Sequence, residues 1–293
     1  MRIAQVAPLT ESVPPQLYGG TERVVAFLTD ELVRLGHDVT LFASGDSRTA
    51  ATLVPVCPRA LRLAGPCQDA LAPHLLMLEK VAKCAGQFDI LHFHVSQFHF
   101  PLVRRLKVAH VTTLHGRLDL RELPPLYEEF ADVPVVSISD EQRQPLPRAG
   151  WIGTVYHGLP LDLLKFHPGR GRYLAFLGRI APEKRVDRAI AIAIACGQPL
   201  RIAAKVDPAD QAYFEREIRH LLDHPLVEFI GEIGEDQKSD FLGGGKSLLF
   251  PLDRPGPFGL VTIGAPACGA PVVAFPGGDG SEVVDERVPA YIV

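Results

Sequence analysis

The chain has 293 residues, of which 47% are hydrophobic, and its formal net charge is −4 at pH 7. This length and apolar content suffice for two buried cores, so we expect two domains rather than one. A slightly acidic chain without a long basic run is not typical of a protein that binds nucleic acid. The 5 cysteines form no Cys-x-x-Cys pair, which indicates neither a disulfide framework nor a zinc ribbon and favours a cytoplasmic protein.

The hydrophobic patterning gives no sign of a membrane-spanning segment. No apolar run approaches the roughly 20 residues that such a helix needs. The first residues, Met1–Ala7, have the pattern of a strand and not of a signal peptide. Peripheral membrane contact through a surface patch stays open, and the sequence does not determine the oligomeric state.

The chain opens with a strand, a glycine loop, a helix and a second strand. The strands are predicted over Arg2–Ala7 and Asp38–Ala43, and apolar residues at helical spacing predict the helix over Thr21–Leu35. Such a unit is right-handed by default. Gly19 and Gly20 precede the helix, where they would let the backbone approach a ligand closely. A plain tight turn is the alternative interpretation of this glycine pair.

The rest of the first half continues the alternation, with a loop-like stretch over residues 46–73. A helix is predicted over Pro73–Ala85, and strands over Asp89–His94, His110–Leu114, Val133–Ile138 and Ile152–Tyr156.

Four histidines lie near the ends of two of these strands. Strand alternation places His92 and His94 on one face, and His99 follows shortly after. No carboxylate or thiolate nearby completes a metal site, so we expect these three to line a polar crevice or to pack. His115 ends the next strand and precedes a glycine, which places it well for contact with a substrate. Its alternative is a histidine bonded to local backbone.

A segment rich in glycine and proline, Gly158–Arg172, separates the two halves and predicts the domain boundary. We therefore expect domains over residues 1–158 and 159–293. The second half alternates again, with strands over Tyr173–Leu177, Leu200–Ala204, Val227–Ile230, Ser247–Phe250 and Pro271–Phe275, and helices over Val186–Ala195, Pro208–Leu222, Glu235–Leu242 and Phe258–Cys268. Two such domains predict an α/β protein with two Rossmann-like lobes and a cleft between them.

Three positive side chains follow strands of the second half. Arg179 and Lys184 lie in the turn after the first strand, and Lys205 ends the second. Because the carboxyl ends of parallel strands line the ligand crevice, these cations should converge there, beside a helix N-terminus. This arrangement fits a dianion such as a diphosphate. Solvated loop charges are the alternative.

One motif is a decoy. Gly245-Lys246-Ser247 is similar to the end of a P-loop, but Asp240 stands where the first glycine would be. The segment also runs from helix to strand, the reverse of a P-loop.

Taken together, short motifs along nearly the whole chain resemble the retaining, GT-B-fold glycosyltransferases of family 4. They are Tyr18-Gly19-Gly20-Thr21-Glu22, Leu114-His115-Gly116-Arg117-Leu118-Asp119, Val136-Ser137-Ile138-Ser139-Asp140, Leu177-Gly178-Arg179-Ile180-Ala181-Pro182-Glu183-Lys184, Phe229-Ile230-Gly231-Glu232, Pro257-Phe258-Gly259-Leu260-Val261 and Ala267-Cys268-Gly269-Ala270-Pro271-Val272-Val273. The combination is specific and its order is that of the family.

The resemblance implies a nucleotide-diphosphate sugar as donor, with no further cofactor, and an acceptor that is a sugar, a lipid or a small molecule. It implies that His115 faces the transferred sugar as the catalytic residue. The positions implied to bind the donor are Arg179, Lys184 and Lys205 for the diphosphate, Gly19 and Gly20 for backbone approach, Ile233 near the base, and Phe258, Gly259, Leu260 and Val261 for amides toward sugar and phosphate.

The sequence departs from the family pattern in its acidic motif. Gly256 and Gly264 stand where the family has two glutamates, and each lost hydrogen bond to the donor costs about 1.5–3 kcal/mol. A non-catalytic nucleotide-sugar-binding or partner protein is therefore the alternative function. Gly264 and Pro266 also predict a short or distorted helix. No Asp-x-Asp motif occurs, so we expect the cations to replace a metal's charge and activity to be metal-independent.

Overall fold

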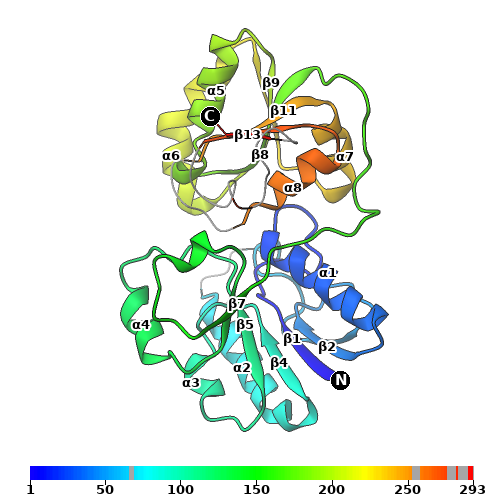
Figure 1. Cartoon of the computed structure of the whole chain (residues 1–293), viewed down its shortest axis with the longest axis vertical. Helices are drawn as coiled ribbons and strands as arrows, with labels where there is room; N and C mark the ends of the chain where they lie inside the picture. The colour runs from blue at the N-terminus through cyan, green and yellow to red at the C-terminus, as the bar shows by residue number, and fades with distance from the viewer. Residues whose placement is uncertain (66–68, 253–257, 276–281, 283–289, 293) are drawn as a thin grey trace. The chain divides into compact units, whose positions relative to one another are not determined.

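The structure is a computed structural model, and it describes residues 1–65, 69–252, 258–275, 282 and 290–292. The chain divides into two compact units, Met1–His157 and Gly158–Val293. Each unit is built on one parallel sheet with helices between its strands (Figure 1). The α/β class with two Rossmann-like units is thus confirmed. In the described part of the chain, no helix combines the length and hydrophobicity that crossing a bilayer requires.

Unit 1 contains a 7-stranded sheet in the order β3-β2-β1-β4-β5-β6-β7. Every described strand pair is parallel, so the carboxyl ends of all these strands lie along one edge. The strands are β1 (Arg2–Val6), β2 (Asp38–Ala43), β3 (Thr52–Pro55), β4 (Ile90–Phe93), β5 (His110–Thr113), β6 (Val135–Ser137) and β7 (Trp151–Thr154).

In the described part of unit 1, the helices between the strands are α1 (Gly20–Arg34), α2 (Leu71–Cys84), α3 (Phe100–Val103) and α4 (Leu123–Glu129). Helix α1 buries Val25, Ala26 and Thr29 and ends beside Gly36, whose φ of 85° is the left-handed conformation that glycine tolerates. The core on the α2 side of the sheet centres on apolar strand residues and on Met77 and Val81 of that helix.

Unit 2 contains a 6-stranded sheet in the order β10-β9-β8-β11-β12-β13, and its described strand pairs are also parallel. The strands are β8 (Tyr173–Ile180), β9 (Leu200–Val206), β10 (Val227–Gly231), β11 (Gly245–Phe250), β12 (Val272–Ala274) and β13 (Ala290–Ile292). The helices are α5 (Val186–Ala195), α6 (Gln211–Tyr213), α7 (Glu235–Gly243) and α8 (Leu260–Ala267). Both faces of this sheet carry an apolar core.

The structure differs from the sequence predictions in three places. Strand β3 lies within the stretch predicted as a loop; it is a short edge strand, where its terminal Pro55 removes no ladder hydrogen bond. The two short helices α3 and α4, with proline in their first turns, were not predicted. The single helix predicted over Pro208–Leu222 is instead a succession of short 3-10, α-helical and π-helical segments.

Candidate functional site

The first group of predicted site residues lies at the carboxyl edge of the unit 2 sheet. Arg179 and Lys205 are opposite each other in the register of β8 and β9, near the ends of both strands. A carboxylate joins them, because Asp207 lies 2.7 Å from the Lys205 Nζ and 3.6 Å from the Arg179 Nη1. The predicted pair of cations is therefore brought together by the parallel strands.

Two further carboxylates contact the Arg179 guanidinium. Its Nη1 donates to Asp210 Oδ2 at 2.8 Å and its Nη2 to Glu183 Oε1 at 2.5 Å. Arg179 is only partly exposed, so these charge-assisted bonds hold the guanidinium in one orientation. An anionic ligand at this edge would compete with carboxylates for the same donors.

The third predicted cation and the glycine turn before α8 lie near the end of β11. Lys184 Nζ lies 5.8 Å from the centre of the Phe250 ring. A Cβ on Gly259, which caps α8, would lie 3.0 Å from the same ring. Phe258 and Ile233 are buried, while Leu260 and Val261 are half-buried in the first turn of α8. Phe250 thus links Lys184 to the start of α8.

The predicted glycine pair of unit 1 lies at the start of α1. Gly19 caps the helix, and a Cβ there would lie 2.7 Å from Pro15 Cβ, so a larger residue would force the loop to shift. Gly20 is the first helical residue, and a Cβ there would meet nothing within 4 Å. Gly19 is therefore required by packing, whereas Gly20 leaves open space beside the first amides of α1.

Of the two glycines in the altered acidic motif, Gly256 lies outside the described residues. Gly264 is buried in α8, and a Cβ there would lie 3.5 Å from Leu164, 3.7 Å from Leu242 and 4.0 Å from Leu159. These are ordinary van der Waals distances within an apolar surrounding. Helix α8 is short, with Pro266 inside its last turn, as the sequence predicts.

Replacing Gly264 with alanine is expected to stabilise unit 2 by roughly 1 kcal/mol, because alanine favours the helix and its methyl group fits. Gly264→Glu is expected to destabilise it by roughly 2–4 kcal/mol, because a carboxylate would enter apolar surroundings. Urea unfolding of both variants measures the difference. A Gly264→Glu variant as stable as the natural chain would show that this position reaches solvent or a polar partner.

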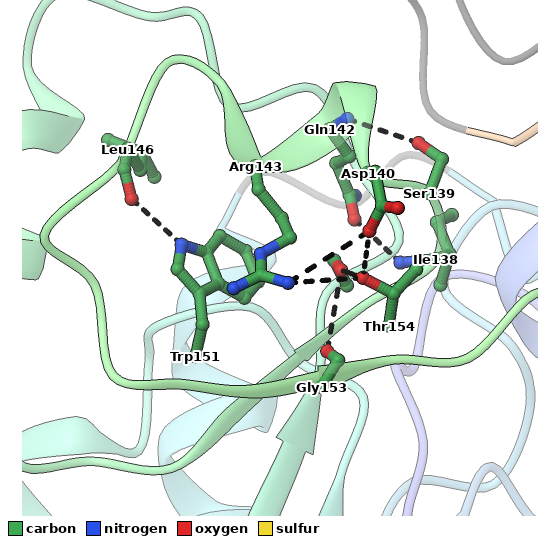
Figure 2. Close-up of polar contacts among 10 residues, drawn as sticks. Ile138, Ser139, Asp140, Gln142, Arg143, Leu146, Trp151, Gly153 and Thr154 are labelled. Carbon is green, nitrogen blue, oxygen red and sulfur yellow. Dashed lines mark hydrogen bonds and ion pairs between the residues drawn. The ribbon is translucent and has the colours of Figure 1, made fainter.

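The second group of site residues surrounds His115, at the carboxyl edge of the unit 1 sheet. Gln142 lies in a 3-10 turn after β6 and is buried. Its carboxamide oxygen accepts from the Ile138 amide at 2.9 Å, a contact drawn in Figure 2. Its Nε2 donates to the carbonyl oxygens of Leu114 and Gly116, each at 2.9 Å. One buried side chain therefore holds the backbone on both sides of His115.

The ring of His115 belongs to a row of buried polar side chains. Its Nε2 lies 2.8 Å from His94 Nδ1, and its Nδ1 lies 3.4 Å from His157 Nε2. The other nitrogen of His94 lies 2.8 Å from the Gln5 carboxamide oxygen. The His92 ring lies beside the His94 ring, tilted by 37°, with 4.2 Å between ring centres. The His115 ring thus has two side-chain partners, His94 directly after β4 and His157 after β7, and not local backbone.

Burial keeps these imidazoles uncharged near neutral pH. Desolvation lowers the pKa of His92 and of His157 to about 4. It also lowers the pKa of His94 and of His115 well below the ordinary value of 6.5, and the neighbouring imidazoles add to the effect. His115 can therefore exchange hydrogen bonds with a ligand, but it carries no positive charge at pH 7.

His99 does not join this row. Its ring stacks on Phe93, with 3.9 Å between centres, and its Nε2 lies 2.7 Å from Thr112 Oγ1. Burial lowers its pKa to about 3. Of the three histidines considered together in the sequence, two line the row and His99 packs in the core. Within the described residues, no group of three or more His, Cys, Asp or Glu side chains could hold a metal ion.

Unit 1 is expected to lose stability as the pH falls below about 6.5. His94 and His99 are neutral when folded but take up protons when unfolded, so the unfolded chain binds more protons and stability rises with pH in this range. Between pH 7 and 5.5 each buried histidine should cost roughly 1 kcal/mol. Urea unfolding at a series of pH values measures the slope.

A His99→Gln variant should show a shallower dependence of stability on pH than the natural chain. Equal slopes for His99→Gln and the natural chain would contradict the assignment of the effect to His99.

Sequence reasoning missed Gln5, Gln142 and His157. Gln5 occupies a strand position that reads as part of an apolar run, and Gln142 lies in a segment without regular pattern. His157 directly precedes the glycine at the predicted boundary, and this position is the only feature of the sequence that could have pointed to it. All three act through contacts between segments far apart in the chain.

Comparisons with known proteins agree with this architecture. The family described as Glycosyltransferase Family 4 matches residues 18–210, and the family described as Glycosyl transferases group 1 matches residues 165–293. A comparison with curated proteins finds no match.

Several solved structures share the fold. The glycosyltransferase AviGT4, involved in avilamycin A biosynthesis, is 22% identical with a TM-score of 0.74 and covers 100% of this chain and 83% of its own. Sucrose-phosphate synthase from Thermosynechococcus elongatus is 18% identical, with a TM-score of 0.79 and coverage of 100% and 85%. HepE from Anabaena, in complex with UDP and glucose, is 19% identical, with a TM-score of 0.77 and coverage of 100% and 85%. These likenesses confirm the GT-B fold. With about two thirds of its residues matched by the first family, the chain belongs to the glycosyltransferases described as Glycosyltransferase Family 4.

Proposed function

We propose that the protein transfers a sugar from a nucleotide-diphosphate sugar to an acceptor hydroxyl, with retention of configuration and without a metal ion. The cations at the unit 2 sheet edge carry this proposal. Arg179 and Lys205 lie together there and share Asp207, and this is the position where parallel α/β sheets bind ligands. The solved structure of HepE from Anabaena contains UDP and glucose, which supports a donor of this class.

The cations match the charge that develops in such a reaction. The bond between the anomeric carbon and the diphosphate oxygen breaks, the acceptor oxygen bonds to the same face of that carbon, and its proton leaves with the diphosphate. Negative charge grows on the diphosphate while the sugar gains oxocarbenium character. Arg179, Lys184 and Lys205 would stabilise the diphosphate, and the first amides of α8, after Phe258 and Gly259, would add their dipoles.

His115 suits a sugar that becomes positively charged. A protonated imidazolium beside an oxocarbenium ion would raise the barrier by repulsion. Burial holds the pKa of His115 well below 6.5, so the ring is neutral and can accept or donate a hydrogen bond to a sugar hydroxyl. We propose this as its catalytic role.

Donor binding and turnover test the proposal. Calorimetry with UDP, GDP and ADP sugars identifies the base, and release of free nucleotide diphosphate in the presence of candidate acceptors measures transfer. The anomeric configuration of the product, read by NMR, tests retention. Transfer is expected to continue in the presence of EDTA, and a complete loss would refute metal independence.

A binding protein without transferase activity is the second candidate function. It is favoured by Gly264, whose position in α8 offers no carboxylate and faces leucine side chains. Tight binding of a nucleotide sugar without hydrolysis or transfer would support this candidate over the first. Absence of binding to every nucleotide sugar would count against both.

A further inference from the structure

We propose that Gln5, acting through His94, fixes the ring tautomer of His115. The inference about the ring rests on unit 1 alone, and its consequence for a sugar rests on the proposed function. Gln5 is the fourth residue of β1 and is 0% exposed, while His94 follows β4 and is 3% exposed. Neither side chain therefore has water as an alternative partner.

The direction of hydrogen bonding follows from the Gln5 carboxamide. Its oxygen carries no hydrogen, so His94 Nε2, at 2.8 Å, must donate to it. A neutral imidazole has one N–H, which leaves His94 Nδ1 as an acceptor. His115 Nε2 lies 2.8 Å from that atom and must then be the protonated nitrogen of His115.

The other half of the Gln5 carboxamide agrees with this direction. Its Nε2 lies 3.4 Å from His92 Nδ1, to which it can only donate. His92 then carries its hydrogen on Nε2, which lies 2.8 Å from the Thr113 hydroxyl oxygen. One carboxamide orientation thus satisfies both neighbouring rings, His92 and His94, at once.

The consequence is a lone pair on His115 Nδ1. This atom faces His157 Nε2 at 3.4 Å, a long contact for a hydrogen bond. A sugar hydroxyl could therefore replace His157 and donate to Nδ1. In this arrangement His115 accepts from its ligand, and Gln5 and His94 are positioning residues that would make a hydroxyl a better partner than a carbonyl or phosphate oxygen.

Nitrogen-15 NMR of histidine-labelled full-length protein at pH 7.5 tests the tautomer without any donor. The His115 signals, assigned by comparison with His115→Gln, are expected to show a protonated Nε2 and a bare Nδ1. In Gln5→Met, which keeps the side-chain length but removes the acceptor, His115 should become a mixture of tautomers. Gln5→Glu keeps an oxygen toward His94 and should restore the Nε2–H form.

Thr113→Val is the matched control, since it removes the partner of His92 but leaves the row from Gln5 to His115 intact. A natural protein with Nδ1–H on His115, or a Gln5→Met variant whose His115 tautomer is unchanged, would overturn the proposal. Kinetics test the consequence for a sugar separately. Once a donor is known, Gln5→Met should lower kcat about tenfold and change KM by a smaller factor. Failure to find any donor would refute the proposed function and leave the tautomer result standing.

Discussion

Gln142→Leu is expected to lower the free energy of unfolding by roughly 3–5 kcal/mol. The substitution leaves the Ile138 amide and the carbonyls of Leu114 and Gly116 without their partner, and an unsatisfied buried group costs about 1–3 kcal/mol. The folded fraction of the Gln142→Leu protein should also lose most transferase activity, because the backbone on both sides of His115 is no longer held in place. Urea unfolding and transfer assays measure the two effects.

Gln142→Glu separates the loss of donors from the change of shape. Its carboxylate can still accept from the Ile138 amide, but its second oxygen would face two carbonyl oxygens. Protonation would supply one donor, so this variant should gain stability as the pH falls from 7 toward 5, relative to the natural chain. Gln144→Leu, at an exposed position two residues away, is the control and should change stability by less than about 0.5 kcal/mol. A Gln142→Leu variant of natural stability and activity would contradict the assigned role.

Arg179→Ala is expected to weaken binding of the donor nucleotide by about 10–100-fold. Hydrogen bonds between a charged group and a ligand contribute about 1.5–3 kcal/mol each, and Arg179 offers two nitrogens at the end of β8. The remaining carboxylates, Asp210 and Glu183, would also lose their partner and repel a diphosphate. Calorimetry with the nucleotide diphosphate and with the nucleotide sugar measures the change.

Arg201→Ala provides the matched control. Arg201 lies near the start of β9, where it pairs with Glu228 at 2.8 Å. It belongs to the same sheet as Arg179 but lies at the amino ends of the strands, away from the proposed diphosphate site. Its removal should leave donor affinity unchanged. Equal losses of affinity in the two variants would indicate a general effect of positive charge, and an unchanged affinity in Arg179→Ala would remove the proposed diphosphate site.

The sequence predicted the central strands and most of the longer helices because burial on both sheet faces leaves continuous apolar runs. Strand β3 was not predicted because it is four residues long, half-buried and ends at a proline. Helices α3 and α4 were not predicted because one or two helical turns are too short to show a hydrophobic period. The segment after β9 changes its hydrogen-bond spacing repeatedly, so no single helical period describes it.

Within the candidate site, only the positions that the parallel strands determine could be predicted from the sequence. Arg179 and Lys205 lie near the carboxyl ends of β8 and β9, which are consecutive strands, so their proximity was predictable from chain order. The carboxylates that hold Arg179, and the bonds from Gln142 to both sides of His115, depend on side-chain contacts that no spacing rule gives. The apolar surroundings of Gly264 likewise depend on leucines from α7 and from the segment before β8.

The order of strands has a consequence for how each unit assembles during synthesis. The first strand of either unit, β1 or β8, ends up enclosed, with strands made later adding on both of its sides. One of its two rows of backbone donors and acceptors can pair with β2 or β9, but the other must wait until β4 or β11 has left the ribosome. A deletion that removes either strand would split its sheet into two fragments, whereas trimming β3 or β10 would only narrow it.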